Sequence, residues 1–332
     1  MPIALITGIT GQDGSFLAEQ LIQSGWRVFG LVRRSASPNY WRIQHLLDDL
    51  TLLDGDLGDL ASIVRVLSDV MPDHIYNLAS QSYVATSWNQ PLLTGDITGQ
   101  GAVRMLEAMR LVCPKARFYQ ASSSEMFGLQ LHEQMLNEET PFHPRSPYGC
   151  AKAFAHHMAI NYRESYGLHV VSGILFNHES ERRGEEFVTR KISKAVAAIA
   201  AGRQKSLKLG DISVHRDWGF AGDYTKAIHL LLSHDEPMDL VIATGQAHSV
   251  KDFVVRAFDC VDLNWEDWVE HDPSLLRPAD IPMLCGDSSK AQKTLSWQPS
   301  LDFDSLVQRM VEADCHRIQH LGEMKHQHQK YA

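Results

Sequence analysis

The sequence has no long apolar stretch, few cysteines and no excess of positive charge. No apolar run reaches the about 18 residues of a membrane-spanning helix, so we expect no membrane partner. The five cysteines include no Cys-x-x-Cys pair, which argues against a metal site or a disulfide framework and favours a cytoplasmic protein. The formal net charge of -9 argues against nucleic acid as a partner. We expect no signal peptide, because the first residues already form a predicted strand.

Length and apolar content fit a large globular α/β protein. The chain has 332 residues, 44% of them hydrophobic, which suits one large unit or two closely joined domains. Short apolar runs alternate with helical stretches, and these predicted strands are residues 3–6, 28–32, 50–53, 74–78, 117–121 and 170–176. Alternation of this kind predicts a Rossmann-type, doubly wound parallel sheet that binds ligands at the carboxyl ends of its strands.

The pattern loosens after Phe176, which predicts a smaller second domain interleaved with the first. We expect residues 1–177 to bind a dinucleotide, with residues 214–247 returning to that domain. Residues 178–213 and 248–325 would then form an α/β substrate-binding domain, and residues 326–332 a frayed polar tail.

Three glycines follow the first predicted strand. Gly8, Gly11 and Gly14 stand between residues 3–6 and an amphipathic helical stretch. Gly8 permits a tight turn, Gly11 lets the backbone approach a pyrophosphate, and Gly14 permits close packing of helix on strand. The alternative is a tight strand-to-helix turn without a ligand, but the position directly after the first strand favours a dinucleotide site.

The end of the second predicted strand indicates which dinucleotide binds. An acidic residue there usually meets the free ribose hydroxyl of NAD, whereas this chain has Arg33, Arg34 and Ser35. Two guanidinium groups and a hydroxyl suit the 2′-phosphate of NADP. We therefore expect NADP, the alternative being two solvated arginines. Asp56, after the third strand, is placed to accept a hydrogen bond from an adenine amino group.

Tyr148 and Lys152 form a Tyr-x-x-x-Lys motif at the start of a predicted helix. Side chains four positions apart share one helix face, so the phenol and the ammonium can reach the same point. Lowering a tyrosine pKa from about 10 to about 7 takes roughly 4 kcal/mol. A cation about 4 Å away supplies about that much at an effective dielectric constant of about 20. The pair therefore fits proton transfer at a hydroxyl that loses hydride, although the same spacing also occurs on helix surfaces without function.

Taken together, these motifs resemble the extended short-chain dehydrogenase/reductases and, within them, the GDP-mannose 4,6-dehydratase family. The resemblance covers nearly the whole chain. Its specific stretches are residues 8–14, 32–35, 118–122, 144–149, 174–180, 187–192, 216–219, 243–245 and 248–250. It implies a tightly bound NADP, a GDP-sugar substrate and an internal redox dehydration.

The resemblance also implies roles for four catalytic residues. Tyr148 takes the proton of the sugar 4-hydroxyl, and Lys152 lowers the tyrosine pKa and holds the nicotinamide ribose. Glu125 removes the proton from C5 and helps water to leave C6. Ser123 stands where the family has a threonine beside the substrate. The alternative for Glu125 is a carboxylate that only stabilises a helix N-terminus, and for Ser123 a capping hydroxyl.

The expected binding residues surround these four. For the cofactor they are Gly8, Thr10, Gly11, Gln12, Asp13, Gly14, Arg33, Asp56, Leu57, Leu78, Ala79, Ser80, Ser82, Tyr148, Lys152, His178 and Arg183. For the substrate they are Ser82, Ser123, Glu125, Asn177, Val188, Lys191, Arg216 and Arg277. The alternative for the basic residues is a solvated surface cation, and a lone histidine such as His178 is more often structural.

Several departures from the family pattern keep alternatives open. Leu93 replaces a tyrosine, Cys150 a valine and Glu181 a proline, and the segment before Arg277 is shortened. The sugar is therefore less certain than the reaction, and a heptose or another GDP-linked sugar stays possible. A nucleotide-sugar reductase or epimerase would need no base such as Glu125, and a redox-sensing binding protein would need no tyrosine–lysine pair.

The resemblance further predicts a homo-oligomer, either a dimer or a tetramer. We expect the helices after Gly99 and Tyr148 to form the contact. The apolar side chains predicted for it are Ala155, Met158, Ala159 and Tyr162.

Overall fold

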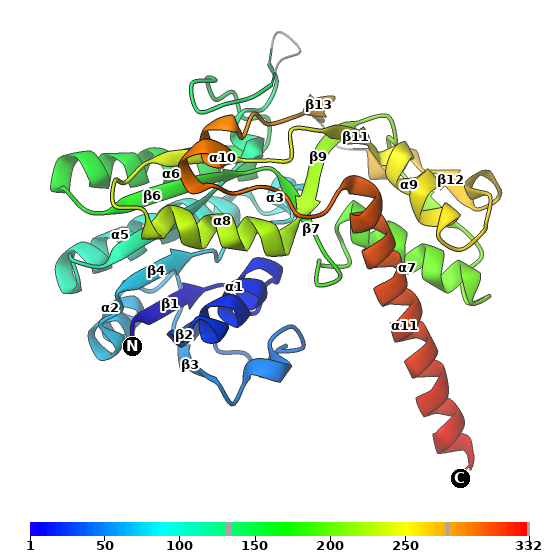
Figure 1. The fold of residues 1–332 in the computed structure, drawn as a ribbon, viewed down its shortest axis with the longest axis horizontal. Helices are drawn as coiled ribbons and strands as arrows, with labels where there is room; N and C mark the ends of the chain where they lie inside the picture. Colours follow the sequence, from blue (N-terminus) through cyan, green and yellow to red (C-terminus); the bar gives the residue numbers. More distant parts are fainter. Residues whose placement is uncertain (131–134, 277–278, 331–332) are drawn as a thin grey trace.

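A seven-stranded parallel sheet forms the centre of the molecule (Figure 1). The computed structural model describes residues 1–130, 135–276 and 279–330, with side chains to residue 320. The sheet has the order β10-β6-β5-β4-β1-β2-β3. Its strands are β1 (Ile3–Thr7), β2 (Arg27–Val32), β3 (Leu50–Asp54), β4 (His74–Asn77), β5 (Arg117–Ser123), β6 (Val170–Leu175) and β10 (Asp239–Ile242). The predicted α/β fold is confirmed.

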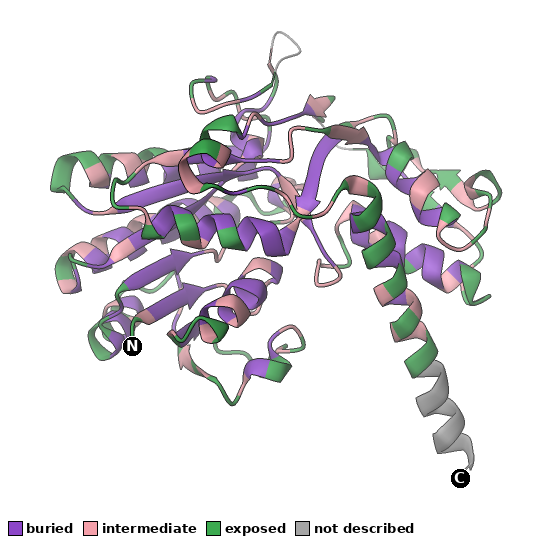
Figure 2. Cartoon of the chain, in the orientation of Figure 1, coloured by how far each residue is buried: buried purple, intermediate pink, exposed green. Residues whose placement is uncertain are grey.

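Helices cover both faces of this sheet, which explains why its strands are mostly apolar. Helices α1 (Gln12–Gln23) and α8 (Ala221–Ser233) cover one face. Helices α2 (Leu60–Val70), α5 (Gly101–Val112) and α6 (Pro147–Tyr166) cover the other. Figure 2 shows the buried residues on the strands and on the helix faces toward them. These helices leave the carboxyl ends of the strands uncovered, and we call this end of the sheet its open edge.

The segment before α5 is more helical than the sequence predicted. The expected helix began at Gly99, but helix α3 (Val84–Asn89), helix α4 (Pro91–Thr94) and a π-helical turn, η2 (Gly95–Gln100), precede it. Pro91 occupies the first turn of α4 and lacks an N–H, so it separates α4 from α3. All three elements pack against α6.

A second, smaller unit lies beside that open edge. Strand β9 (His215–Phe220) pairs with β7 (Asn177–Glu179), β11 (Ala247–Ser249) and β13 (Met283–Leu284), and β8 (Leu207–Leu209) pairs with β12 (Val269–His271). Helices α7 (Val188–Ala200), α9 (Val250–Asp259) and α11 (Phe303–Lys330) enclose its core, while the short α10 (Ser289–Leu295) packs on the first unit. The short helical turns are η1 (Gln44–Leu46), η3 (Ser124–Met126), η4 (Trp265–Asp267) and η5 (Pro273–Leu275). The domain boundaries drawn from the sequence stay a prediction.

Three further features bear on the sequence analysis. Helix α11 continues to Lys330, where the sequence predicted a frayed tail from residue 326. Within the described residues, no helix has the length and apolarity needed to cross a membrane. All five cysteines are free thiols.

Candidate active site

One cavity of about 510 Å³ lies where the carboxyl ends of the large sheet face the second unit. It brings together predicted residues from distant parts of the chain. Those lining it are Gly8, Thr10, Gly11, Gln12, Asp13, Gly14, Leu78, Ala79, Ser80, Ser82, Ser123, Glu125, Tyr148, Lys152, Asn177, His178, Arg183, Val188, Lys191 and Arg216. The folding of the chain therefore assembles most of the predicted site in a single cavity.

The glycine turn leaves a helix N-terminus bare on the cavity. Gly8 has a φ of 71°, which favours glycine. A Cβ added at Gly14 would lie 2.3 Å from the Gly8 carbonyl oxygen. Gly11 forms the N-cap of α1, and no side chain caps the helix there. Uncapped N–H groups together with the helix dipole attract an anion, so this turn fits the pyrophosphate of a dinucleotide.

Asp13 and His178 form an ion pair across the same end of the cavity. His178 Nε2 lies 2.8 Å from Asp13 Oδ2, and Nδ1 lies 2.7 Å from the Phe176 carbonyl oxygen. Burial raises the pKa of Asp13, but the charge and hydrogen bond of His178 outweigh this and hold it at about 2. Burial lowers the pKa of His178, yet Asp13 produces a net rise. Since both ring nitrogens face acceptors, the imidazole is protonated.

The neighbouring polar side chains are also paired with one another. Ser180 Oγ donates to Gln12 Oε1 at 2.7 Å, and Thr189 Oγ1 donates to Glu179 Oε2 at 2.5 Å. The Arg183 guanidinium lies 3.1 Å from Glu179 and 3.6 Å above the Phe187 ring. We call the cavity surface formed by Gln12, Asp13, His178, Glu179, Arg183 and Thr189 the binding wall. Its charged groups are positioned by other protein groups.

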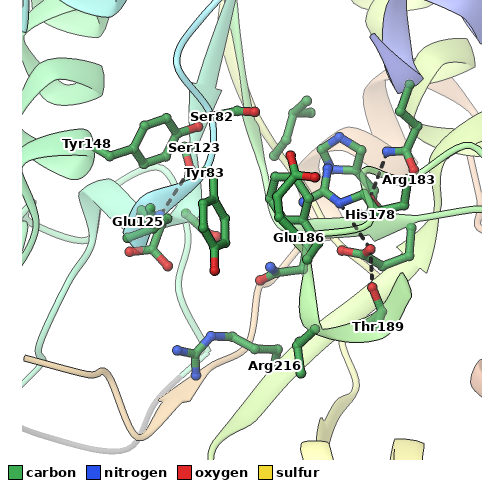
Figure 3. A pocket seen from close by; sticks show the side chains of 18 of the residues that line it. Ser82, Tyr83, Ser123, Glu125, Tyr148, His178, Arg183, Glu186, Thr189 and Arg216 are labelled. Atoms are coloured by element: carbon green, nitrogen blue, oxygen red, sulfur yellow. Dashed lines mark hydrogen bonds and ion pairs between the residues drawn. The ribbon is translucent and has the colours of Figure 1, made fainter. Parts of the chain in front are cut away.

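A second surface, which we call the catalytic wall, consists of Ser123, Glu125 and Tyr148. Ser146 caps the N-terminus of α6 through the Gly149 N–H, which sets Tyr148 in its first turn. Ser123 ends β5, and its hydroxyl accepts a hydrogen bond of 3.3 Å from the Glu125 N–H. Figure 3 shows all three side chains on the side of the cavity opposite His178 and Arg183. Among the described residues, none donates a hydrogen bond to the Glu125 carboxylate.

The pKa of Tyr148 differs from the value near 7 expected for the motif. Burial raises it to about 12, a hydrogen bond with Ser123 lowers it, and the charge of Glu125 raises it. The Lys152 ammonium lies 5.7 Å from the centre of the phenol ring. The Lys152 ammonium donates to the Ala121 carbonyl oxygen at 2.7 Å, and burial lowers its own pKa to about 8. Ser123 is therefore the side chain that most favours the tyrosinate in this structure.

Basic groups line the part of the cavity beyond the two walls. The Arg216 guanidinium donates to Asp280 Oδ1 at 2.9 Å and to the Ile281 carbonyl oxygen at 2.7 Å. Lys191 extends from α7, and burial lowers its pKa while the charge of Asp272 opposes that change. Figure 3 places Arg216 apart from both walls. The two cations give this part of the cavity the charge needed for a diphosphate.

A few predicted residues do not line the cavity. Arg33 follows β2 at the surface, and Leu57 is buried. The Asp56 carboxylate accepts a hydrogen bond of 2.8 Å from the Gly58 N–H. Arg277 lies outside the described residues. The roles given to these four stay predictions.

The structure also adds residues that the sequence analysis missed. Tyr83 and Phe187 line the cavity, and their rings meet edge to face at 5.5 Å. Glu186 also lines the cavity (Figure 3). The sequence analysis came close to both rings, because Tyr83 follows the predicted Ser82 and Phe187 precedes the predicted Val188. Among the residues with described positions, no cluster of His, Cys, Asp or Glu could hold a metal ion.

The parallel sheet, the uncapped glycine turn and the Tyr148–Lys152 motif define an enzyme of the short-chain dehydrogenase/reductase type. The model of the family described as GDP-mannose 4,6 dehydratase matches residues 5–310. GDP-mannose 4,6 dehydratase 1 of Arabidopsis thaliana is 49% identical over 324 residues, which cover 94% of this chain and 89% of the relative. The chain belongs to the GDP-mannose 4,6-dehydratase family and is an enzyme of hydro-lyase type.

Solved structures support the fold. That of dTDP-glucose 4,6-dehydratase from Bacillus anthracis in complex with NAD has a TM-score of 0.83 at 21% identity, covering 94% of this chain and 96% of that one. That of RMD from Pseudomonas aeruginosa complexed with NADPH has a TM-score of 0.80 at 22% identity, covering 96% and 100%. The fold is therefore shared with proteins that bind either nicotinamide dinucleotide.

Proposed function

We propose that this protein dehydrates GDP-mannose to GDP-4-keto-6-deoxy-mannose, with NADP as its resident cofactor. The observation that supports this most is the catalytic wall, where Glu125 and Tyr148 are close enough for the charge of Glu125 to shift the tyrosine pKa. A reaction confined to one hydroxyl needs one proton-transfer group. A dehydration after oxidation needs a second, at the neighbouring carbon.

The glycine turn and the binding wall would hold the cofactor. The bare N-terminus of α1 fits the pyrophosphate, and the Asp13–His178 pair lies beside it. Arg33, at the end of β2, supports NADP rather than NAD because a guanidinium suits the 2′-phosphate. When bound, NADP would supply the hydride-transfer chemistry between the sugar C4 and C6, together with positive charge near the tyrosine.

Tyr148 would act first, taking the proton of the 4-hydroxyl as that carbon is oxidised. Its ordinary resting form is the neutral phenol, since burial raises its pKa to about 12. The phenol must therefore lose a proton as the reaction proceeds. Ser123 favours the tyrosinate through its hydrogen bond, and the buried Lys152, with a pKa of about 8, supplies a cation next to the phenol ring.

Glu125 would act second. The new 4-ketone makes the C5 proton acidic. The Glu125 carboxylate is available to remove this proton, because no described residue donates a hydrogen bond to the carboxylate. The carboxylic acid then gives that proton to the departing C6 hydroxyl, which leaves as water. After hydride returns at C6, C5 needs a proton, and the one that Tyr148 took from the 4-hydroxyl would go there, which restores the tyrosine. The net change is the loss of one water, with no net oxidation. Lys191, Arg216, Asn177 and Val188 would hold the GDP part, and we propose the same for Arg277.

The discriminating experiment is a mass measurement on the product. The purified protein is incubated with GDP-mannose, and the molecular mass of the nucleotide sugar is measured by mass spectrometry. We expect the loss of one water without added reductant. A mass gain of two hydrogens from a 4-keto sugar would support the reductase alternative, and an unchanged mass with a new stereocentre would support the epimerase. A GDP-linked heptose that is dehydrated much faster would reassign the sugar alone.

We also propose a cytoplasmic homo-oligomer, a dimer or a tetramer, through the expected helix α6 but by a different face of that helix. Ala155, Ala159 and Tyr162 are 0%, 0% and 6% exposed, because this stripe of α6 faces the core of the first unit. Exposed apolar side chains nearby include Phe154 at 41%, Leu92 at 88% and Leu93 at 47%. Sedimentation of the wild type and of Phe154→Glu tests this, and a monomeric wild type at micromolar concentration would contradict it.

A further inference from the structure

The cavity has an apolar end beyond its basic residues. There Leu209 and Gly210 at the end of β8 face Leu275 and Leu276 near η5, with Val214 beside them. Leu275 is 44% exposed and Leu276 is 50% exposed, although both line a cavity. Gly210 packs so closely on this segment that an added Cβ would lie 3.0 Å from the Leu275 carbonyl oxygen. Exposed leucines that line a slot suit the flat face of a nucleobase.

This apolar end follows the diphosphate-binding part of the cavity. Lys191 and Arg216 also line the cavity, and the charge of Asp272 reaches Lys191 from the segment that pairs with β8. The catalytic wall belongs to the other unit. A sugar at Glu125 and Tyr148, a diphosphate at Lys191 and Arg216, and a base beyond them follow the order of a nucleotide sugar.

Asp211 is the acidic group at this end. Its Oδ1 accepts hydrogen bonds from Ser213 Oγ at 2.6 Å and from the Ser213 N–H at 2.8 Å. Both bonds lower the pKa of the carboxyl group, so it is ionised at neutral pH. Within the part of the chain that the structure describes, no group donates to Oδ2. One oxygen is thus fixed by Ser213 while the other remains able to accept from a ligand.

We propose that Asp211 selects guanine at this end of the cavity. Guanine presents two adjacent donors, the N1–H and the 2-amino group, and a carboxylate can accept from both. Uracil and thymine present one N–H between two carbonyl oxygens, which repel a carboxylate. Adenine presents its amino group beside an acceptor nitrogen. This inference rests on the proposed function and deepens it, because it assigns recognition of the base to one side chain.

Nucleotide binding tests the proposal without requiring turnover. GDP and IDP, which differ only in the 2-amino group of the base, are titrated calorimetrically into the full-length protein. We expect the wild type to bind GDP about 10- to 100-fold more tightly than IDP, as for a hydrogen bond to a charged group. Asp211→Asn should remove most of that preference. Ser213→Ala, which frees Oδ1, should reduce it and keeps the proposal testable if the first variant does not fold.

Asp287→Asn is the matched control. Asp287 accepts the same pair of hydrogen bonds, from the N–H and hydroxyl of Ser289, but does not line the cavity. This variant should keep the full preference for GDP. Equal wild-type affinity for GDP and IDP, or an unchanged preference in Asp211→Asn, overturns the proposal. If the protein still dehydrates GDP-mannose, either outcome contradicts only the role of Asp211 and not the proposed function. A wild type that binds neither nucleotide overturns both.

Discussion

The two walls of the cavity differ in how their polar groups are partnered. On the binding wall, Asp13 is paired with His178, and Glu179 with Thr189 and Arg183. On the catalytic wall, the Glu125 carboxylate accepts no hydrogen bond from any described residue. The side chains of the binding wall are therefore already paired without a ligand, whereas the Glu125 carboxylate on the catalytic wall is still able to accept a proton.

This difference follows from what each wall would have to do. A group that only holds a cofactor binds it more tightly when it is already fixed, because the entropy cost of ordering the side chain has been met during folding. A group that removes a proton must have lone pairs free for the substrate. Substitutions on the binding wall should therefore affect stability and affinity, and those on the catalytic wall should affect turnover.

The largest expected effect is that of Tyr148→Phe. This substitution removes the only hydroxyl assigned to proton transfer at the sugar 4-hydroxyl. Turnover of GDP-mannose should fall by about 10²–10⁴-fold, with no reduction of the cofactor. Tyr162→Phe, on the same helix but with its hydroxyl bound to Glu107, is the control and should keep its activity. Near-normal turnover of Tyr148→Phe would place the proton transfer elsewhere.

A smaller effect is expected for Arg33→Glu. The substitution reverses the charge at the end of β2, so NADP should bind roughly 10- to 100-fold more weakly while NAD binding changes little. Fluorescence titration of both cofactors measures this. Lys205→Glu makes the same charge reversal at an exposed position and should leave both affinities unchanged. Equal wild-type affinity for NADP and NAD would refute the proposed preference.

The smallest effect is on stability, at the Asp13–His178 pair. The pKa of Asp13 falls from 3.8 to about 2, so Asp13→Asn should lower the free energy of unfolding by about 2 kcal/mol. Urea denaturation near pH 5 measures this, with the exposed Asp48→Asn as the control. An Asp13→Asn variant as stable as the wild type would show that the pair contributes nothing.

The pH dependence of that difference has a defined sign. The pKa of Asp13 is depressed, so its contribution is complete above its ordinary value of 3.8 and is lost as the pH falls toward 2. The pKa of His178 is raised, so its contribution is complete below its ordinary value of 6.5 and is lost as the pH rises through the raised value. The difference in the free energy of unfolding between wild type and Asp13→Asn should therefore be largest between pH 3.8 and pH 6.5.

Local sequence patterns predicted the sheet and the loops that carry the site. Buried parallel strands are mostly apolar, and ligands bind at their carboxyl ends, so Gly8 was found from position, whereas Ser123 and Asn177 came from the family resemblance. Contacts between distant residues were not predictable in this way. Asp13 and His178 were each expected to meet the cofactor, but no local pattern indicated that they meet each other. Likewise, the inward face of α6 around Ala159 depends on what packs against it.

Electrostatics were the least predictable part of the site. The spacing of Tyr148 and Lys152 suggested a lowered tyrosine pKa, yet burial dominates and raises it. The Lys152 ammonium is held by the Ala121 carbonyl oxygen, which the spacing alone does not reveal. Desolvation depends on the whole surrounding fold, so a short motif identifies the chemical groups but not their proton affinities.

Glu125→Gln tests most directly the claim that Glu125 and Tyr148 act in successive steps. The substitution leaves Tyr148 in place but removes the base for C5. The first oxidation should then proceed while dehydration slows by about 10²–10⁴-fold. Absorbance of bound reduced nicotinamide, followed after mixing with GDP-mannose, should rise and persist, whereas the wild type and the exposed Glu164→Gln control should show only a transient. Turnover of Glu125→Gln at the wild-type rate, without reduced cofactor, would contradict the account.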